Sequence, residues 1–215
     1  MHFPVMSDLI QRFGLRMTTG VVLASLFVGV YFFLPPWVMT VLLGVALGEI
    51  LLFEWPRICP LNQLLCWLVA PFYPIFPFML MIHMNSHEQY RQWLFLAFVL
   101  AAVFDTGSYL VGKCFGRTSL CAISPDKTWE GFIGGMAAVF ATLWLLVGWQ
   151  AGSTLALTLV VSVVALAGDL FESWFKRRAE VKDAGNLLPG HGGLLDRFDS
   201  IIAVILLCYL LAQWV

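Results

Sequence analysis

Residues 176–200 read KRRAEVKDAGNLLPGHGGLLDRFDS, a polar stretch in a chain that is otherwise largely apolar. The stretch gathers five basic side chains, four acidic side chains, one histidine and a Gly-Gly pair. Glycine lets a backbone come close to a ligand, and acidic and basic groups together suit a site that holds both a cation and an anion. The stretch therefore indicates a hydrophilic site attached to an apolar scaffold.

The composition of the whole chain indicates a protein that is partly surrounded by membrane lipid. Of the 215 residues, 60% are hydrophobic and 12% are charged, whereas soluble domains average about 45–50% apolar and about 25% charged residues. A soluble fold of this composition would have too few polar side chains to cover its surface. The net charge of −1 gives no overall field that would attract nucleic acid. We therefore predict an all-α, polytopic integral membrane protein with no nucleic-acid partner.

Seven apolar segments are candidate membrane-spanning helices, because a span needs about 20 mostly apolar residues. No internal repeat divides them, so we predict a single membrane domain, 1–215, with N-terminal helices in 1–100 and a catalytic half in 101–215. The third candidate contains three prolines and is expected to be kinked or re-entrant. The candidates are residues 17–34, 37–55, 61–83, 92–112, 132–149, 153–173 and 200–215.

The basic residues predict the orientation of these helices. With a cytosolic N-terminus and seven alternating spans, eleven of the twelve Lys and Arg residues lie on the cytosolic side, and only Arg91 lies outside. The two long polar segments, 113–131 and 174–199, share the cytosolic side. A site built from these two loops would face the cytosol at the surface of the membrane, which in a bacterium is the inner membrane.

One glycine pair and the five cysteines are interpreted as packing features. Gly131 and Gly135 have the GxxxG spacing that is typical of closely packed membrane helices. The cysteines show no CxxC or metal-ligand spacing, and a free Cys packs as a small hydrophobic residue. They are Cys59, Cys66, Cys114, Cys121 and Cys208.

Two apolar helices carry a carboxylate at membrane depth and cations nearer the surface. An intramembrane carboxylate is costly, so it is a candidate for function. The alternatives are a structural Asp–Lys pair in the first helix and an interfacial anchor with snorkelling cations in the second, although an anchor does not account for Asp169. The side chains that share a helix face are Asp105, Ser108, Tyr109 and Lys113 in the first helix, and Asp169, Glu172, Ser173, Lys176 and Arg177 in the second.

The polar loops add further candidates. SPDKTWEG, at 124–131, is typical of a turn that leads into a helix, where Lys127, Thr128 and Glu130 could serve a phosphate or a metal, or simply form a solvated loop and a cap. Asp196 and Asp199 share one face in the first turn of the last helix. They could chelate a hard cation such as Mg²⁺, or complement the helix dipole.

These motifs together resemble those of the CTP:phosphatidate cytidylyltransferases, the CDP-diacylglycerol synthases. The resemblance rests on S-x2-KR-x4-KD at 173–183 and P-x-HGG-x2-DR-x-D at 189–199. Two upstream stretches, FDTGSYLVGKCFGR at 104–117 and SPDKTWEG, follow the order found in the family. The resemblance covers 104–200 and implies that the phosphate of phosphatidate attacks the α-phosphorus of CTP, which forms CDP-diacylglycerol and releases pyrophosphate.

The resemblance also implies one or two divalent cations, such as Mg²⁺, and a homodimer among membrane lipids. By position, it assigns metal binding to Asp169, Ser173, Asp196 and Asp199. It assigns catalytic contacts with phosphates to Lys176, Arg177, Lys182, His191 and Arg197. It assigns the other half of the substrate cleft to Asp105, Lys113, Ser124, Lys127, Thr128, Glu130, Gly192 and Gly193.

Two departures leave alternatives open. Asp126 stands where the family usually has Lys, and the chain is shorter than typical members. A CDP-archaeol-type synthase therefore remains open, as does a CTP-dependent lipid kinase of the polyprenol type, which would release CDP instead of pyrophosphate. A non-enzymatic ion or solute transporter would use Asp105 and Asp169 as coordinating groups. The crowding of polar residues at the cytosolic ends of the helices argues against a transporter.

Overall fold

The computed structural model describes residues 3–59, 64–147, 151–187 and 192–214, and the side chains of the first helix from Thr18 onward. Regular structure in these residues is helical, apart from isolated bridge positions, which include an antiparallel bridge between Ser119 and Thr128. This confirms the all-α prediction. In chain order the elements are α1 (Phe3–Phe33), α2 (Pro36–Glu49), η1 (Ile50–Glu54), α3 (Trp55–Ile58), α4 (Leu64–Val69), η2 (Pro71–Ile75), α5 (Phe76–Ser86), α6 (Glu88–Phe115), α7 (Trp129–Val147), α8 (Ala151–Arg178) and α9 (Leu195–Ala212).

Several helical stretches match the predicted spans. Among the described residues, five stretches are long and apolar enough to cross a membrane: Pro36–Ile58, Leu64–Ser86, Glu88–Phe115, Trp129–Leu146 and Gly152–Arg178. The apolar stretch Thr18–Phe33 is shorter, and α9 begins with a charged turn. A polytopic membrane fold follows from these helices, while the count of seven spans and the cytosolic N-terminus stay predictions.

Two of these stretches contain a π-helical segment. In the proline-rich third candidate, the chain does not end its helix at the prolines but continues through η2, which contains Pro71 and Pro74. Proline has no N–H and clashes with the preceding turn, and a π-bulge is one of the known ways in which a helix accommodates such an interruption. The other segment, η1, ends at Glu54, which becomes important below.

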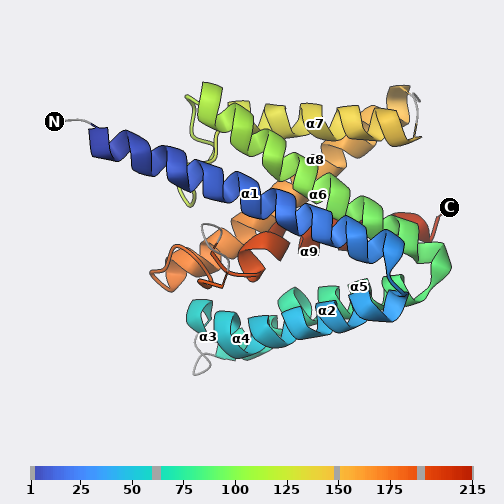
Figure 1. Ribbon diagram of the computed structural model, residues 1–215. Helices are drawn as coiled ribbons and strands as arrows, with labels where there is room; N and C mark the ends of the chain where they lie inside the picture. Colours follow the sequence, from blue (N-terminus) through green and yellow to red (C-terminus); the bar gives the residue numbers. More distant parts are fainter. Residues whose placement is uncertain (1–2, 60–63, 148–150, 188–191, 215) are drawn as a thin grey trace.

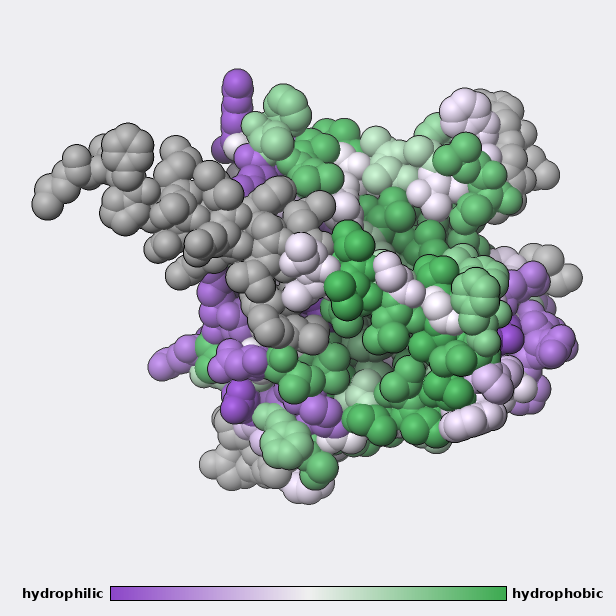
Figure 2. Space-filling model, in the orientation of Figure 1, coloured by the Kyte–Doolittle hydropathy of each residue, from purple (hydrophilic) through white to green (hydrophobic). Residues whose placement is uncertain are grey.

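The helices form two groups (Figure 1). α6, α7, α8 and α9 pack against one another, with α7 lying along α6, and α2 lies beside α5. α5 contacts both α6 and α9, so it joins the two groups. α6 and α8 end where α7 and α9 begin, and this antiparallel arrangement brings both polar loops to one end of the bundle. Figure 2 shows a broad apolar face, with hydrophilic side chains gathered towards its two sides, as expected of a protein surrounded by lipid.

The interpretation of all five cysteines as packing residues is wrong for Cys59 and Cys66. The two form a disulfide between the end of α3 and α4, with a Cα–Cα distance of 5.4 Å. Their separation of seven residues matches no common motif. Cys208 is a buried free thiol, as predicted.

The α6–α7 contact depends on glycine, as the GxxxG spacing predicts. A Cβ atom at Gly135 would overlap the side chains of Ser108 and Phe104. A Cβ atom at Gly107 would lie 2.8 Å from the Cβ of Ala138 and 2.9 Å from the carbonyl oxygen of Gly134. These are short, stiff groups that cannot rotate away, so the two helices approach this closely only because the side chains are absent.

Gly107→Ala should therefore destabilise the protein, although alanine is the better helix former. Overpacking costs about 1–3 kcal/mol, against a gain of about 0.5–1 kcal/mol from replacing a helical glycine. Gly44→Ala in α2 is the matched control, because nothing lies within 4 Å of the added Cβ. Thermal unfolding in detergent should show a lower midpoint for Gly107→Ala and an equal or higher midpoint for Gly44→Ala. Equal stability of both variants would refute the close-packing argument.

Candidate active site

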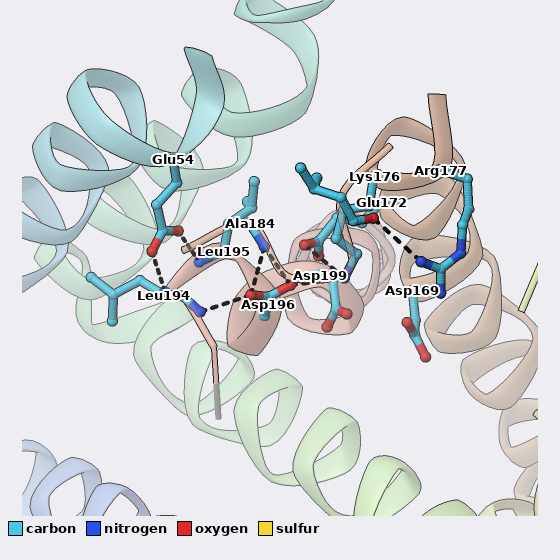
Figure 3. Close-up of polar contacts among 12 residues, drawn as sticks. Glu54, Asp169, Glu172, Lys176, Arg177, Ala184, Leu194, Leu195, Asp196 and Asp199 are labelled. Carbon is cyan, nitrogen blue, oxygen red and sulfur yellow. Dashed lines mark hydrogen bonds and ion pairs between the residues drawn. The ribbon is translucent and has the colours of Figure 1, made fainter. Parts of the chain in front are cut away.

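The predicted site residues gather at the polar end of the bundle. Four helices and two loops supply them, and contacts between the elements fix their positions. Figure 3 shows the central carboxylates and their partners. The exception is His191, which lies outside the described residues, so its predicted role stays a prediction.

Lys127 links the first polar loop to α8. Its Nζ lies 2.5 Å from Oδ2 of Asp169, and its backbone carbonyl accepts the N–H of Leu120 at 2.7 Å. Both charges are mostly withdrawn from solvent, with side-chain exposures of 18% and 28%. This ion pair holds the 116–128 loop against the helix that carries Asp169.

Thr128 and Glu130 organise the same loop. The Thr128 hydroxyl accepts the N–H of Gly131 at 3.1 Å, which caps the start of α7. The Glu130 carboxylate accepts the N–H groups of Arg117 and Thr118 at 3.2 and 3.3 Å. The Thr128 contact supports the cap alternative, whereas Glu130 orders the loop before α7; the predicted contact of both residues with substrate stays a prediction.

Asp105 joins α6 to α9. Its Oδ2 accepts the hydroxyl hydrogen bond of Ser200 at 2.7 Å. The alternative of an Asp105–Lys113 pair is not what the structure shows, because the Lys113 ammonium donates instead to the hydroxyl of Tyr109 at 3.2 Å. Asp105 therefore faces the centre of the bundle, towards the carboxylates of α8 and α9.

A buried ionic network surrounds Asp196. The ammonium of Lys176 lies 2.8 Å from Asp196 Oδ1 and 3.2 Å from Glu172 Oε1. Asp196 also accepts the N–H of Ala184 at 2.9 Å and that of Gly193 at 2.7 Å. Both oxygens of Asp196 are thus committed to protein donors. The network ties the loop between α8 and α9 to both helices.

The surroundings of Asp196, which lies outside the five apolar stretches, favour its charged form. Burial by itself raises the pKa of this carboxyl group. The ammonium of Lys176 and the N–H of Gly193 outweigh that effect, and the pKa lies below its ordinary value. Asp196 is therefore an ionised carboxylate that organises the loop.

Asp105, Asp169 and Glu172 surround Asp199 closely enough to interact with it electrostatically. Asp169 and Asp199 direct their carboxylates to the same side in Figure 3. Over the described residues, no group of three His, Cys, Asp or Glu side chains has ready-made metal geometry. The predicted metal set of Asp169, Ser173, Asp196 and Asp199 therefore stays a prediction, and Ser173 lies buried on α8.

The remaining predicted cations lie exposed on the loop between α8 and α9 and on the ends of α6, α8 and α9. Lys113, Arg177, Lys182 and Arg197 are exposed, and Arg177 donates to the carbonyl of Ile123 at 3.4 Å, which brings α8 against the first loop. Beside this contact is a cavity of about 500 Å³. Its lining residues are Ala122, Ile123, Pro125, Trp174, Arg177 and Arg178.

Sequence reasoning missed three polar residues of this region. Ser200 was read as the end of the polar loop, yet it holds Asp105. Glu172 was placed on the polar face of α8 but given no role, yet it contacts Lys176. Glu54 falls within the predicted span 37–55, for which no polar contact is predicted from sequence, yet its carboxylate accepts the N–H groups of Leu194 and Leu195. The one available signal for Glu54 was the cost of an unpaired carboxylate at membrane depth.

Removing the carboxylate of Asp196 should destabilise the fold. Asp196→Ala would leave the Lys176 ammonium buried beside Glu172 and two backbone N–H groups without their acceptor. Breaking a buried ion pair costs about 3–5 kcal/mol, so the unfolding midpoint in detergent should fall by several degrees. Asp126→Ala, at an exposed position, should leave the midpoint unchanged. Wild-type stability of Asp196→Ala would contradict the network described here.

Comparison with known proteins supports the family resemblance that the motifs indicate. The model of the cytidylyltransferase family matches residues 57–215. The phosphatidate cytidylyltransferase of Bacillus subtilis (strain 168) is 45% identical over 137 residues, which are 60% of this chain and 51% of that protein. The phosphatidate cytidylyltransferase of Staphylococcus aureus (strain COL) is 40% identical over 148 residues, 62% of this chain and 54% of that protein.

The chain spans about half the length of these two relatives. A third relative matches over most of both chains: the phosphatidate cytidylyltransferase of Rickettsia typhi (strain ATCC VR-144 / Wilmington) is 35% identical over 207 residues, 89% of this chain and 88% of that protein. Family membership thus rests on a match to most of the chain as well as on the shared motifs. The chain belongs to the cytidylyltransferase family.

Proposed function

We propose that this protein transfers CMP from CTP to phosphatidate, which forms CDP-diacylglycerol and releases pyrophosphate. The observation that carries the proposal is the cluster of Asp105, Asp169 and Asp199, contributed by three helices at the polar end of an apolar bundle. The family match and the relatives named phosphatidate cytidylyltransferase support the same reaction.

The chemistry needs little proton transfer. A phosphate oxygen of phosphatidate forms the new bond to the α-phosphorus of CTP, and the bond from that phosphorus to the bridging oxygen of pyrophosphate breaks. The attacking phosphate is already an anion at neutral pH, so a strong general base is unnecessary. The task of the protein is to bring two anions together and to balance the charge that develops on the leaving group.

A divalent cation is part of the proposal, and it rests on the type of donor present, since the described side chains do not form a ready-made metal geometry. Asp105, Asp169 and Asp199 offer hard carboxylate oxygens, which Mg²⁺ prefers. Lys127 pairs with one of these three carboxylates, that of Asp169. We propose these three side chains as the ones that would hold the ion. When bound, the ion would neutralise charge on the reacting phosphates.

The cations divide into two kinds. Lys176 is buried and committed to Asp196 and Glu172, so we assign it the task of holding the loop in place. Arg177, Lys182 and Arg197 are exposed at the polar end of the bundle, and we propose that they bind the polyphosphate of CTP. We therefore propose that the nucleotide binds beside the exposed cations, with its reacting phosphate near the carboxylates.

The apolar bundle suits a lipid substrate. The acyl chains would stay in hydrocarbon while the head group reaches the polar end of the helices. We propose that this end faces the cytosol and that the membrane is the bacterial inner membrane, because eleven of the twelve basic residues then lie on the cytosolic side. A homodimer remains a proposal that rests on the family resemblance.

The reaction can be tested with purified protein, labelled CTP and phosphatidate in the presence of Mg²⁺. We expect CDP-diacylglycerol and pyrophosphate in equal amounts, loss of activity in EDTA and recovery when Mg²⁺ is restored. Asp169→Asn and Asp199→Asn should each lower turnover by about 100-fold or more, the scale of losing one preorganised electrostatic contact. Asp126→Asn is the matched control and should keep its activity.

The products separate the alternatives. Release of CDP with a phosphorylated lipid would show a CTP-dependent kinase and overturn the proposal. Nearly full turnover by both Asp169→Asn and Asp199→Asn would instead refute the assigned cation site. An archaeal ether lipid offered beside phosphatidate tests which lipid the enzyme prefers.

Asp126→Lys tests the departure from the family motif. Asp126 is exposed, and its neighbour Lys127 is the residue that reaches Asp169. Exposed substitutions away from buried networks have small effects, so we expect turnover within about twofold of wild type. A folded but inactive Asp126→Lys variant would contradict this expectation.

A further inference from the structure

We propose that Glu54, far from the motifs in sequence, is a positioning residue for the active site. Its carboxylate caps the N-terminus of α9 and fixes the glycine pair that precedes this helix. Glu54 lies before the residues that the family model matches, 57–215. The inference rests on the proposed function for its effect on catalysis, but the contact itself can be tested without any activity.

The contact is short, buried and made by two donors. Glu54 is 1% exposed, and its two oxygens accept the N–H groups of Leu194 and Leu195 at 2.7 Å each. The first N–H groups of a helix have no partner within the helix, and an anion there is stabilised by the helix dipole. Leu194 has an apolar side chain and cannot cap α9 itself. The cap comes instead from a residue 140 positions earlier in the chain.

The same contact explains the second glycine of the Gly192-Gly193 pair. Gly192 has φ of 79°, a left-handed conformation that favours glycine. Gly193 is not in that region, yet a Cβ atom there would overlap the carboxylate of Glu54. A Cβ atom at Gly185, in the first half of the same loop, would also overlap the carboxylate of Glu54. The first glycine thus serves the backbone conformation, and the second leaves room for Glu54.

Glu54 is itself anchored to the helix that carries the acidic residues. The neighbouring Trp55 is buried and its ring lies 5.7 Å from that of Phe175 on α8. Phe175 is adjacent to Lys176, the partner of Asp196. Two carboxylates therefore hold the same loop: Glu54 binds the N–H groups of 194 and 195, and Asp196 binds those of 184 and 193. Together they set where Asp199, one turn further along α9, stands relative to α8.

The substitutions follow from the donor geometry. Glu54→Gln keeps the size of the side chain but turns one acceptor into an NH₂ donor that faces a backbone N–H, which leaves that buried N–H without a partner. Glu54→Asp keeps the charge and both acceptors on a side chain that is shorter by one methylene. Glu88→Gln is the matched control, because Glu88 is exposed at the start of α6.

Hydrogen exchange measures the contact directly. In full-length protein in detergent, Glu54→Gln should speed amide exchange in a peptide covering 192–199, whereas Glu88→Gln should leave it unchanged. In the CMP-transfer assay, Glu54→Gln should lower kcat by about 10- to 100-fold, because a small misplacement of reacting groups has effects of this size. The KM for CTP should change by less than about threefold, and Glu54→Asp should recover part of kcat. Unchanged exchange in Glu54→Gln would overturn the inference whatever the activity.

Gly193→Ala tests the same contact by crowding the Glu54 carboxylate. It replaces Glu54→Gln as the test if that variant does not fold. The added Cβ should speed exchange over 194–199 and lower kcat in the wild-type background. In the Glu54→Asp background, which leaves more room, the additional loss should be smaller, so the two effects are not additive. Additive losses would show that Gly193 does not act through Glu54. If the wild type produces no CDP-diacylglycerol, the proposed function fails, but the exchange results still decide the role of Glu54.

Discussion

Each carboxylate at the polar end of this bundle needs a donor or a cation, because an uncompensated charge beside apolar helices is strongly unfavourable. That constraint accounts for the architecture of the site. Glu54 is matched by two backbone N–H groups, Asp196 by Lys176 and two more, Asp105 by Ser200, and Asp169 by Lys127. Apart from the bond between Gly193 and Asp196, these contacts join elements that are distant in sequence. The requirement to satisfy charge therefore also fixes how the helices and loops are placed.

The fold class and the location of the site could be predicted from sequence, because both depend on local patterns. Apolar runs of span length predict the helices, and the gathering of charge in two loops predicts the polar end. The helix faces that carry Asp105 and Asp169 follow from helical spacing alone. The prolines of the third candidate predict that its helix is interrupted, as η2 shows, whereas η1 contains no proline or glycine that would predict a π-helical segment.

Partner choice was much harder to predict than position. Lys113 and Asp105 share a face two turns apart, yet Lys113 bonds to Tyr109 while Asp105 bonds to Ser200 on another helix. Cys59 and Cys66 form a disulfide that no spacing rule indicates. The sequence contains the residues of each pair, but the pairing depends on which helices meet. The contact of Glu54 could not be predicted for the same reason. Its partners are backbone N–H groups, which every residue except proline has, so no residue type indicates them.

The order of charges along α8 relates this architecture to the reaction. Asp169 is the deepest charge, Glu172 follows one turn later, and Lys176 and Arg177 lie at the polar end of the helix. Lys176 turns inward to the buried carboxylates, whereas Arg177 is exposed. A ligand that enters from the water therefore meets positive charge first and negative charge deeper. The inner carboxylates would repel a polyphosphate alone. A polyphosphate that carries a divalent cation is complementary both to the outer positive charge and to the inner negative charge. This is the physical reason to expect that nucleotide and metal bind here as a unit.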